Sequence, residues 1–260
     1  MKPILLSFFN YDLRSAPVFA GLGALAAMLY LRSRRSALGL TWEDFWGLLL
    51  ALMLGVFVGG VGTYVLLYGP GPTVNLERLL RGHVAGGSFL GVFGGAVAAA
   101  FLFCRQRALA LSPVADALGS AAALGLVFMR VGCLLNGCCY GRPTGSSWGI
   151  VFRDGASRIP HELLGVPLHP IQLYEAGGAG IIFLWLHFVV SPRMRRGAMK
   201  PGSGFLFCMS FYAVLRFVGD FFRASDPGRL AFAGLSTAQL LVLFILALAG
   251  GIWLRRRTPI

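Results

Sequence analysis

The stretch from Met129 to Pro143 holds the densest polar chemistry in the chain. It follows a long apolar run and brings Arg130, Asn136 and three cysteines to the point where hydrocarbon should give way to water. A polar or charged group at that depth costs free energy unless it is paired or used. The stretch is therefore the first candidate for a functional site.

A second polar group lies in the run that ends near residue 222. Tyr212, Arg216, Asp220 and Arg223 are spaced so that they share one face of a helix. An arginine fork suits a phosphate and stays charged when partly desolvated, so Arg130 and Arg216 together suggest recognition of an anionic lipid headgroup. Two alternatives stay open: a ladder of internal ion pairs, and arginines that only reach up to water.

A third polar group surrounds the start of a later apolar run. His169 precedes a proline there, and a neutral imidazole could take a proton from a thiol or a hydroxyl. A capping or hydrogen-bonded structural role is the ordinary alternative for such a histidine. Gln172, Tyr174 and Glu175 occupy the first turn, where an acid is favoured by the helix dipole in any case.

The cysteines Cys133, Cys138 and Cys139 allow three interpretations. They could bind a metal, pair as a redox disulfide, or be small residues at a tight backbone crossing. A structural zinc site needs about four ligands, which these three cysteines alone do not supply. Packing or one bridge from Cys133 to Cys138 or Cys139 is the reading we favour, and we expect no metal. Cys104 and Cys208 lie within apolar runs and are expected to be buried packing residues.

Composition places these residues in a membrane protein. The chain of 260 residues is 57% hydrophobic and only 13% charged, with a mean hydropathy of +0.73. Soluble domains carry roughly 25% charged residues. The net charge of +13 would suggest nucleic acid in a soluble chain, but the arginines cluster between apolar runs, so we expect no nucleic-acid partner.

The apolar runs predict an all-α membrane protein with about seven transmembrane helices. The candidate spans are 17–31, 44–68, 84–103, 114–129, 172–190, 203–219 and 236–254. Recurring glycines, including Gly55 with Gly59 and Gly91 with Gly95, predict close packing of the second and third helices. No repeat or second domain is evident, so residues 1–260 are expected to form one integral membrane domain.

Basic clusters follow the first, third and fifth runs and end the chain. By the positive-inside rule, the N-terminus lies outside and the C-terminus lies in the cytoplasm. This orientation makes 130–171, between helices 4 and 5, an outer-side loop region. All three polar groups then face the outer leaflet.

Taken together, the three groups resemble the prolipoprotein diacylglyceryl transferase family. The resemblance rests on the following motifs: Arg130-x-Gly132-x-x-x-Asn136-Gly137-x-x-x-Gly141-Arg142, His169-Pro170-x-Gln172-Leu173-Tyr174-Glu175, and Tyr212-x-x-x-Arg216-Phe217-x-x-Asp220-Phe221-x-Arg223-x-x-Asp226. It covers most of the chain from about residue 80 onward. It implies seven transmembrane helices and a bacterial inner-membrane enzyme of lipoprotein biosynthesis.

The resemblance also implies a reaction and a site. Such enzymes transfer the diacylglyceryl group of phosphatidylglycerol to the lipobox cysteine thiol of a prolipoprotein signal peptide, releasing glycerol phosphate. No cofactor is implied, and we expect a monomer in contact with membrane lipid. The expected catalytic residues are Arg130, Arg216, His169 and Tyr212. The expected substrate-binding residues are Arg130, Asn136, Gly137, Arg142, Gln172, Tyr174, Glu175, Asp220 and Arg223.

The chain departs from the family pattern at several positions. Cys133 replaces the usual asparagine, Cys138 replaces an acid, and Asp220 replaces a glutamate. In the stretch Ala85–Val92, Leu90 stands where a histidine or tyrosine is usual. Either another base serves, for which His169 is our candidate, or the arginine-rich field activates the acceptor thiol by lowering its pKa. Two alternatives remain open: a thiol-redox membrane protein using the three cysteines, and a related lipid transferase with a different acceptor.

Overall fold

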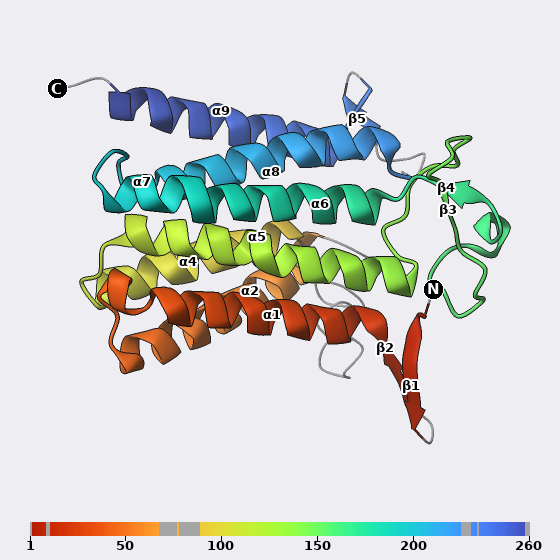
Figure 1. The fold of residues 1–260 in the computed structure, drawn as a ribbon, viewed down its shortest axis with the longest axis horizontal. Helices are drawn as coiled ribbons and strands as arrows, with labels where there is room; N and C mark the ends of the chain where they lie inside the picture. Colours follow the sequence, from red (N-terminus) through yellow and green to blue (C-terminus); the bar gives the residue numbers. More distant parts are fainter. Residues whose placement is uncertain are drawn as a thin grey trace. The chain divides into compact units, whose positions relative to one another are not determined.

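Long helices make up most of the computed structural model, which describes residues 2–8, 11–67, 77, 89–224, 230–232 and 234–257. These helices are α1 (Ser15–Arg34), α2 (Trp42–Leu67), α4 (Phe89–Gln106), α5 (Leu111–Asn136), α6 (Ile171–Trp185), α8 (Ser203–Phe222) and α9 (Thr237–Arg257) (Figure 1). Each falls on one of the apolar runs. The described part of the predicted third span begins only at residue 89.

Short elements connect the helices. Three antiparallel strand pairs occur: β1 (Ile4–Phe8) with β2 (Tyr11–Arg14), β3 (Ile150–Val151) with β4 (Pro167–Leu168), and β5 (Leu230–Phe232) with β6 (Leu235–Ser236). The remaining elements are η1 (Ser36–Leu38), η2 (His161–Leu163), η3 (Leu186–Val190) and α7 (Ser191–Arg195). The π-helical η3 continues α6 into α7 and so lengthens that apolar run.

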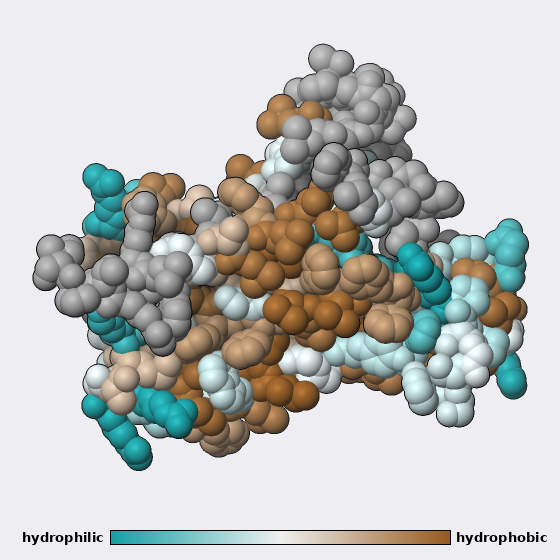
Figure 2. All heavy atoms as spheres, turned by 90° about the horizontal axis from the view of Figure 1, so that it is seen from above, coloured by the Kyte–Doolittle hydropathy of each residue, from teal (hydrophilic) through white to brown (hydrophobic). Residues whose placement is uncertain are grey.

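Five helical segments among the described residues are long and apolar enough to cross a membrane. They are Ser15–Arg34, Trp42–Leu66, Leu111–Asn136, Ile171–Arg195 and Ser203–Phe222, and shorter apolar helices cover Gly91–Gln106 and Val242–Gly251. Hydrophobic side chains gather over the middle of the face seen in Figure 2, with hydrophilic ones towards its ends. The chain is therefore a multi-pass membrane protein.

The larger of two compact units contains residues 1–31 and 116–260. Within it, α8 packs against both α6 and α9 (Figure 1). Asp116 fixes the start of α8, because its carboxylate accepts hydrogen bonds from the backbone amides of Gly202 at 2.6 Å and Phe205 at 2.8 Å. Leu186 and Cys208 belong to a buried apolar cluster between η3 and α8. This packing fixes the helices whose other ends carry the polar groups.

The second unit, residues 32–115, contains the pair α2 and α4. Their backbones meet at glycines: a Cβ at Gly55 would lie 2.6 Å from the Ala99 Cβ, and one at Gly59 would lie 2.9 Å from the Gly95 Cα. Small residues permit such close approach in membranes. The predicted glycine packing of these two helices is confirmed at these positions.

Helix α5 is longer than the sequence predicted. The expected span ended at residue 129, but α5 continues to Asn136, so the first part of the expected loop region is helical. The helix continues through Arg130 because Glu175 of α6 lies against that arginine and neutralises it. The connection to α6 therefore begins at Gly137.

Candidate active site

Four helix ends of the larger unit lie towards the end of that unit that carries the β3–β4 pair. They are the C-terminal ends of α5 and α8 and the N-terminal ends of α6 and α9 (Figure 1). The three polar groups of the sequence lie on three of these ends. A site assembled from segments far apart in the sequence thus depends on the packing of α6, α8 and α9.

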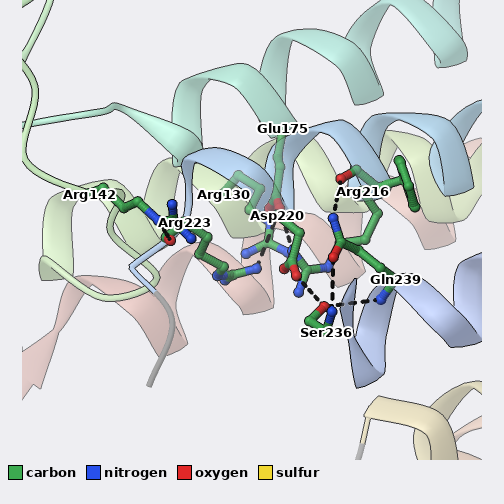
Figure 3. Close-up of polar contacts among 9 residues, drawn as sticks. Arg130, Arg142, Glu175, Arg216, Asp220, Arg223, Ser236 and Gln239 are labelled. Carbon is green, nitrogen blue, oxygen red and sulfur yellow. Dashed lines mark hydrogen bonds and ion pairs between the residues drawn. The ribbon is translucent and has the colours of Figure 1, made fainter. Parts of the chain in front are cut away.

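Glu175 is the centre of the charged group. Its Oε2 atom lies 2.5 Å from Arg130 Nε, and its Oε1 atom lies 3.7 Å from Arg216 Nη1 and 3.6 Å from Arg223 Nη1. Arg216 also contacts Asp220 at 2.9 Å, one turn along α8. Figure 3 shows the carboxylate pointing from α6 into the arginines of α5 and α8. Of the ladder considered as an alternative on α8, the Arg216–Asp220 pair is formed, and Glu175 of α6 joins Arg216 and Arg223 to Arg130 of α5.

These contacts are ion pairs rather than well-formed hydrogen bonds. The Glu175 side chain is only 1% exposed, and Arg130 is 9% exposed. Among the described residues, Arg130 Nε, Arg216 Nη1 and both Glu175 carboxylate oxygens are buried without a hydrogen-bond partner. Buried donors of this kind call for an explanation, and an anionic ligand that accepts from the arginines would provide one.

A serine and a glutamine that sequence reasoning missed complete the charged group. Ser236 Oγ donates to the Asp220 carboxylate and accepts from Gln239 N at 3.1 Å. Gln239 Oε1 in turn accepts from Ser236 N at 2.9 Å, and its amide donates to Phe217 O at 3.4 Å. The bond from Gln239 N to Ser236 Oγ and the bond from Ser236 N to Gln239 Oε1 together form a capping box. Its S-x-x-Q pattern before an apolar run was visible in the sequence.

The loop after α5 is tied to the end of α8. Arg142 donates from its backbone amide to Phe222 O at 2.9 Å and from Nε to Arg223 O at 3.0 Å (Figure 3). The backbone of His169 donates to Arg142 O at 3.0 Å, so the same loop also holds the entrance to α6. A Cβ at Gly141 would lie 2.6 Å from the His169 Cβ, which explains the glycine.

His169 lies in an aromatic group. Its ring packs edge-on against Phe222 with centroids 5.1 Å apart, and its Nδ1 lies 3.4 Å from the Tyr174 hydroxyl. Trp148, which sequence reasoning did not select, donates to that hydroxyl at 2.9 Å. The imidazole is thus held by aromatic rings and a phenol. Tyr212 packs with the apolar cluster of α6 and α8, one turn before Arg216.

The cysteines converge at the C-terminal end of α5, where Cys133 belongs to the last turn and Cys138 and Cys139 follow it. All three thiols are free, and their sulfur atoms lie within 4.8 Å of one another. The backbone amide of Cys138 donates to Cys133 O at 3.0 Å, and Gln172 of α6 donates to Cys138 O at 2.8 Å. Hydrogen bonding from the other two thiols lowers the pKa of the Cys139 thiol, and the charges of Arg223 and Arg130 lower it further. The bridge expected from Cys133 is absent.

A cavity of about 340 Å³ lies beside this turn. It is lined by Arg14, Ala16, Pro17, Asn136, Cys138 and Arg158. Asn136 is only 3% exposed, and its Oδ1 lacks a hydrogen-bond partner among the described residues. Gly137 adopts a φ of +72°, and a Cβ there would lie 2.8 Å from that of Ser157. Asn136 and Gly137 therefore shape one wall beside the cysteines.

Some positions compared at the sequence level are not placed. Residues 85–88 and Asp226 lie outside the described residues, as do residues 68–76 before them. The backbone of Leu90 lies in α4, but its side chain is not described. The charged, aromatic and cysteine groups are thus built from α5, α6, α8, the start of α9 and the loop 137–170.

Comparison with known proteins extends over the whole chain. Residues 3–255 match the family described as prolipoprotein diacylglyceryl transferase. A phosphatidylglycerol–prolipoprotein diacylglyceryl transferase of Solidesulfovibrio magneticus is 35% identical, covering 99% of this chain and 95% of the relative. Proteins of the same name from Geobacter sulfurreducens and Azospirillum brasilense are 32% and 36% identical, covering 99% and 84% of this chain and 96% and 80% of the relatives. The chain therefore belongs to the prolipoprotein diacylglyceryl transferase family.

Proposed function

We propose that this protein transfers the diacylglyceryl group of phosphatidylglycerol to the lipobox cysteine thiol of prolipoproteins, releasing glycerol phosphate. The observation that carries the proposal is the buried charged group, in which Glu175 gathers Arg130, Arg216 and Arg223 from two other helices. The names of relatives that match the chain over its full length support the same reaction. Those names do not favour the thiol-redox alternative.

The arginines are the proposed phosphate site. In the described part of the chain, Arg130, Arg216 and Arg223 make ion pairs with two carboxylates, Glu175 and Asp220, and Arg142 lies beside Arg223 (Figure 3). Arg130 and Arg216 hold the phosphate of the lipid and stabilise the charge that develops on the leaving glycerol phosphate. Donors fixed before the reaction stabilise such charge more effectively than water, which must reorganise.

Glu175 has a positioning role in this proposal. A carboxylate that is 1% exposed and contacts three guanidinium groups sets their directions. Asp220 repeats this arrangement for Arg216 and is itself held by Ser236. The lipid phosphate then meets arginines whose conformational freedom is already lost, which lowers the entropic cost of binding.

The remaining residues surround the substrates. The attack of the acceptor thiol on the glyceryl carbon requires removal of its proton, for which His169 is the proposed acceptor. Tyr212, one turn before Arg216 on α8, is the remaining proposed catalytic residue. The loop, the aromatic group and the wall of the cavity contribute the other substrate contacts, from Asn136, Gly137, Arg142, Gln172, Tyr174 and Arg223.

The site faces the outer leaflet in this proposal. Residues 1–260 form one integral domain of the bacterial inner membrane, with seven transmembrane helices, the N-terminus outside and the C-terminus in the cytoplasm. The basic clusters after α1 and α4, and around α7, support this orientation. The outer-side region that follows α5 then meets signal peptides as they leave the membrane, and the enzyme works as a monomer.

Complementation tests the reaction directly. The chain is expressed in a bacterium depleted of its own transferase, and the mass of a reporter prolipoprotein is measured. We expect a gain of one diacylglyceryl unit, and a reporter whose lipobox cysteine is replaced by serine should gain nothing. Good expression without any gain in mass would overturn the proposed function.

Arginine variants test the phosphate site. We expect Arg130→Ala and Arg216→Lys to lower transfer by at least about a hundredfold, because a lost charge-stabilising contact costs roughly 3–4 kcal/mol in the transition state. Arg153→Ala is the matched control, since Arg153 is an exposed loop arginine. Unchanged transfer in both site variants would exclude these arginines as the phosphate ligands.

A further inference from the structure

The three thiols at the C-terminal end of α5 lie close enough together to hold a metal ion. Their sulfur atoms lie within 4.8 Å of one another, and all three residues are half-buried. Three sulfurs bound to zinc at 2.3 Å in a tetrahedron would be about 3.8 Å apart, so only a small inward movement is needed. In the described part of the chain, no histidine, carboxylate or further cysteine joins the group.

The backbone holds this group in place. Cys138 N donates to Cys133 O at 3.0 Å, and the amide side chain of Gln172 fixes the Cys138 carbonyl at 2.8 Å. Cys139 adopts a φ of +59°, a left-handed conformation that is unfavourable for a residue with a Cβ. Strain of this kind persists only where the surroundings impose it, and it often marks a working site. Here it helps to turn the third thiol towards the other two.

The ligand count indicates the kind of metal site. Structural zinc sites use four protein ligands, whereas catalytic zinc sites use three and leave a fourth position for water or substrate. A zinc ion with three thiolates carries one net negative charge, which suits a group near Arg130 and Arg223. The cavity that reaches Cys138 provides room on one side for an incoming ligand.

We propose that Cys133, Cys138 and Cys139 bind a zinc ion whose open fourth position takes the thiol of the acceptor cysteine. This inference rests on the proposed function, because that function supplies the thiol substrate. It also goes beyond that function, in which His169 takes the thiol proton, the arginines stabilise the leaving group and no metal takes part. The zinc ion activates the nucleophile, and the arginines activate the leaving group.

The step balances as follows. The acceptor thiol loses its proton to His169, the proposed base, as its sulfur binds zinc, because a coordinated thiol is deprotonated. A lone pair of that sulfur forms the new bond to the glyceryl carbon. The bond from this carbon to the phosphate oxygen breaks, and its electron pair leaves with glycerol phosphate at the arginines. The thioether product is neutral and a weaker ligand than a thiolate, so it leaves the metal.

Metal analysis of the full chain, purified in detergent, is the first test. We expect about one zinc per chain, consistent with the affinity of three-thiolate sites. The double variant Cys138→Ser/Cys139→Ser should lose at least about nine-tenths of this zinc. Cys104→Ala is the matched control and should retain it, since Cys104 is buried in α4. A zinc-free wild-type chain, copper in place of zinc, or a disulfide among the three cysteines would overturn the proposal.

X-ray absorption at the zinc edge tests the open position. Adding a lipobox peptide should raise the number of sulfur neighbours from about three to about four, and the same peptide with serine for cysteine should not. A sulfur count that stays unchanged with the cysteine peptide would overturn the proposal.

Transfer assays separate the two proposals. Chelation should lower transfer by at least about tenfold, and added zinc should restore it. Arg216→Lys should retain zinc while losing transfer. Transfer that persists in the zinc-free protein would overturn the zinc proposal and leave the proposed function standing. A zinc-loaded protein that never transfers a diacylglyceryl group would instead overturn the proposed function.

Discussion

At the scale of residues, the chain places a carboxylate where its surroundings alone would not favour one. Glu175 is 1% exposed among arginines from the ends of α5 and α8, and an isolated carboxylate there would be costly. Its three arginine neighbours offset the cost of burying the carboxylate, and the carboxylate offsets the cost of burying the arginines. The charged group is therefore mutually dependent, and removing one member exposes the others to an uncompensated buried charge.

Glu175→Gln tests this dependence. The substitution keeps the shape of the side chain and leaves Arg130, Arg216 and Arg223 with one fewer counter-charge. We expect a loss of roughly 3 kcal/mol in stability, in line with other broken buried ion pairs. We also expect transfer to fall by at least about tenfold, because the arginines lose their fixed directions.

Thermal unfolding in detergent and the mass-based transfer assay measure these effects. Glu162→Gln is the control, because Glu162 is exposed in η2 and should show neither effect. If Glu175→Gln and Glu162→Gln unfolded at the same temperature, the carboxylate would not be the organiser of the arginines.

At the scale of elements, the start of α9 links the charged group to the rest of the larger unit. Ser236 caps α9 through Gln239 and also donates to Asp220 on α8. The capping box thus fixes where α9 begins and, through the same hydroxyl, the carboxylate that pairs with Arg216. A local helix-start signal and a functional contact share one side chain.

Ser236→Ala should therefore have two consequences. Loss of the cap costs about 1 kcal/mol of stability. Loss of the bond to Asp220 loosens Arg216, so transfer should fall more than stability alone would require. Thr41→Ala provides a matched comparison: Thr41 caps α2 with Asp44 in the other unit, accepting from its backbone amide at 3.0 Å.

The two variants should lose similar stability, measured by thermal unfolding. Only Ser236→Ala should also lose transfer per folded molecule. Equal transfer by the two variants would mean that the Ser236 hydroxyl acts only as a cap.

The α2–α4 pair gives a prediction about packing. A Cβ at Gly59 would overlap the carbonyl of Gly91, whereas one at Gly62 on the same helix would meet nothing within 4 Å. Gly59→Ala should destabilise the protein by about 1–3 kcal/mol through overpacking. Gly62→Ala should be neutral or slightly favourable. The unfolding temperatures of the two variants compare the sites directly, and a stable Gly59→Ala would contradict this backbone contact.

At the scale of the whole molecule, sequence patterns located the helices better than their junctions. The apolar runs predicted α1, α2, α5, α6 and α8, because burial in lipid imposes a composition that can be read directly. The end of α5 was misplaced by seven residues, because Arg130 looked like a boundary until its partner Glu175 was known. The spacing of residues along one helix cannot show ion pairs that join three different helices.

For the candidate site too, the sequence identified residues but not how they pack together. Arg130, Arg216 and Arg223 were selected from their types and positions, and the structure brings them to one carboxylate. His169 was selected as a candidate base from its place before a proline, and only tertiary packing shows its ring among aromatic side chains. The convergence of the cysteines also depends on a left-handed turn that the sequence alone does not reveal.

Topology is the prediction that tests the molecule as a whole. The seven proposed spans would put the two termini on opposite sides, and the positive-inside rule would put the C-terminus inside. An epitope inserted after Gly155 should then be accessible to protease in intact spheroplasts, whereas one after Gly197 should be reached only in inverted vesicles. Both sites are exposed connections of the larger unit, so the insertions compare like with like.

The same experiment bears on where the lipid substrate is bound. The charged group lies at the end of the helices that carries residue 155, and the arginines of α7 lie at the other end (Figure 1). Protection of the first epitope and exposure of the second in spheroplasts would invert the protein. The arginines around Glu175 would then face the inner leaflet, away from the side on which secreted prolipoproteins emerge. Each insertion is scored only if transfer survives, which ensures that the topology measured belongs to the active protein.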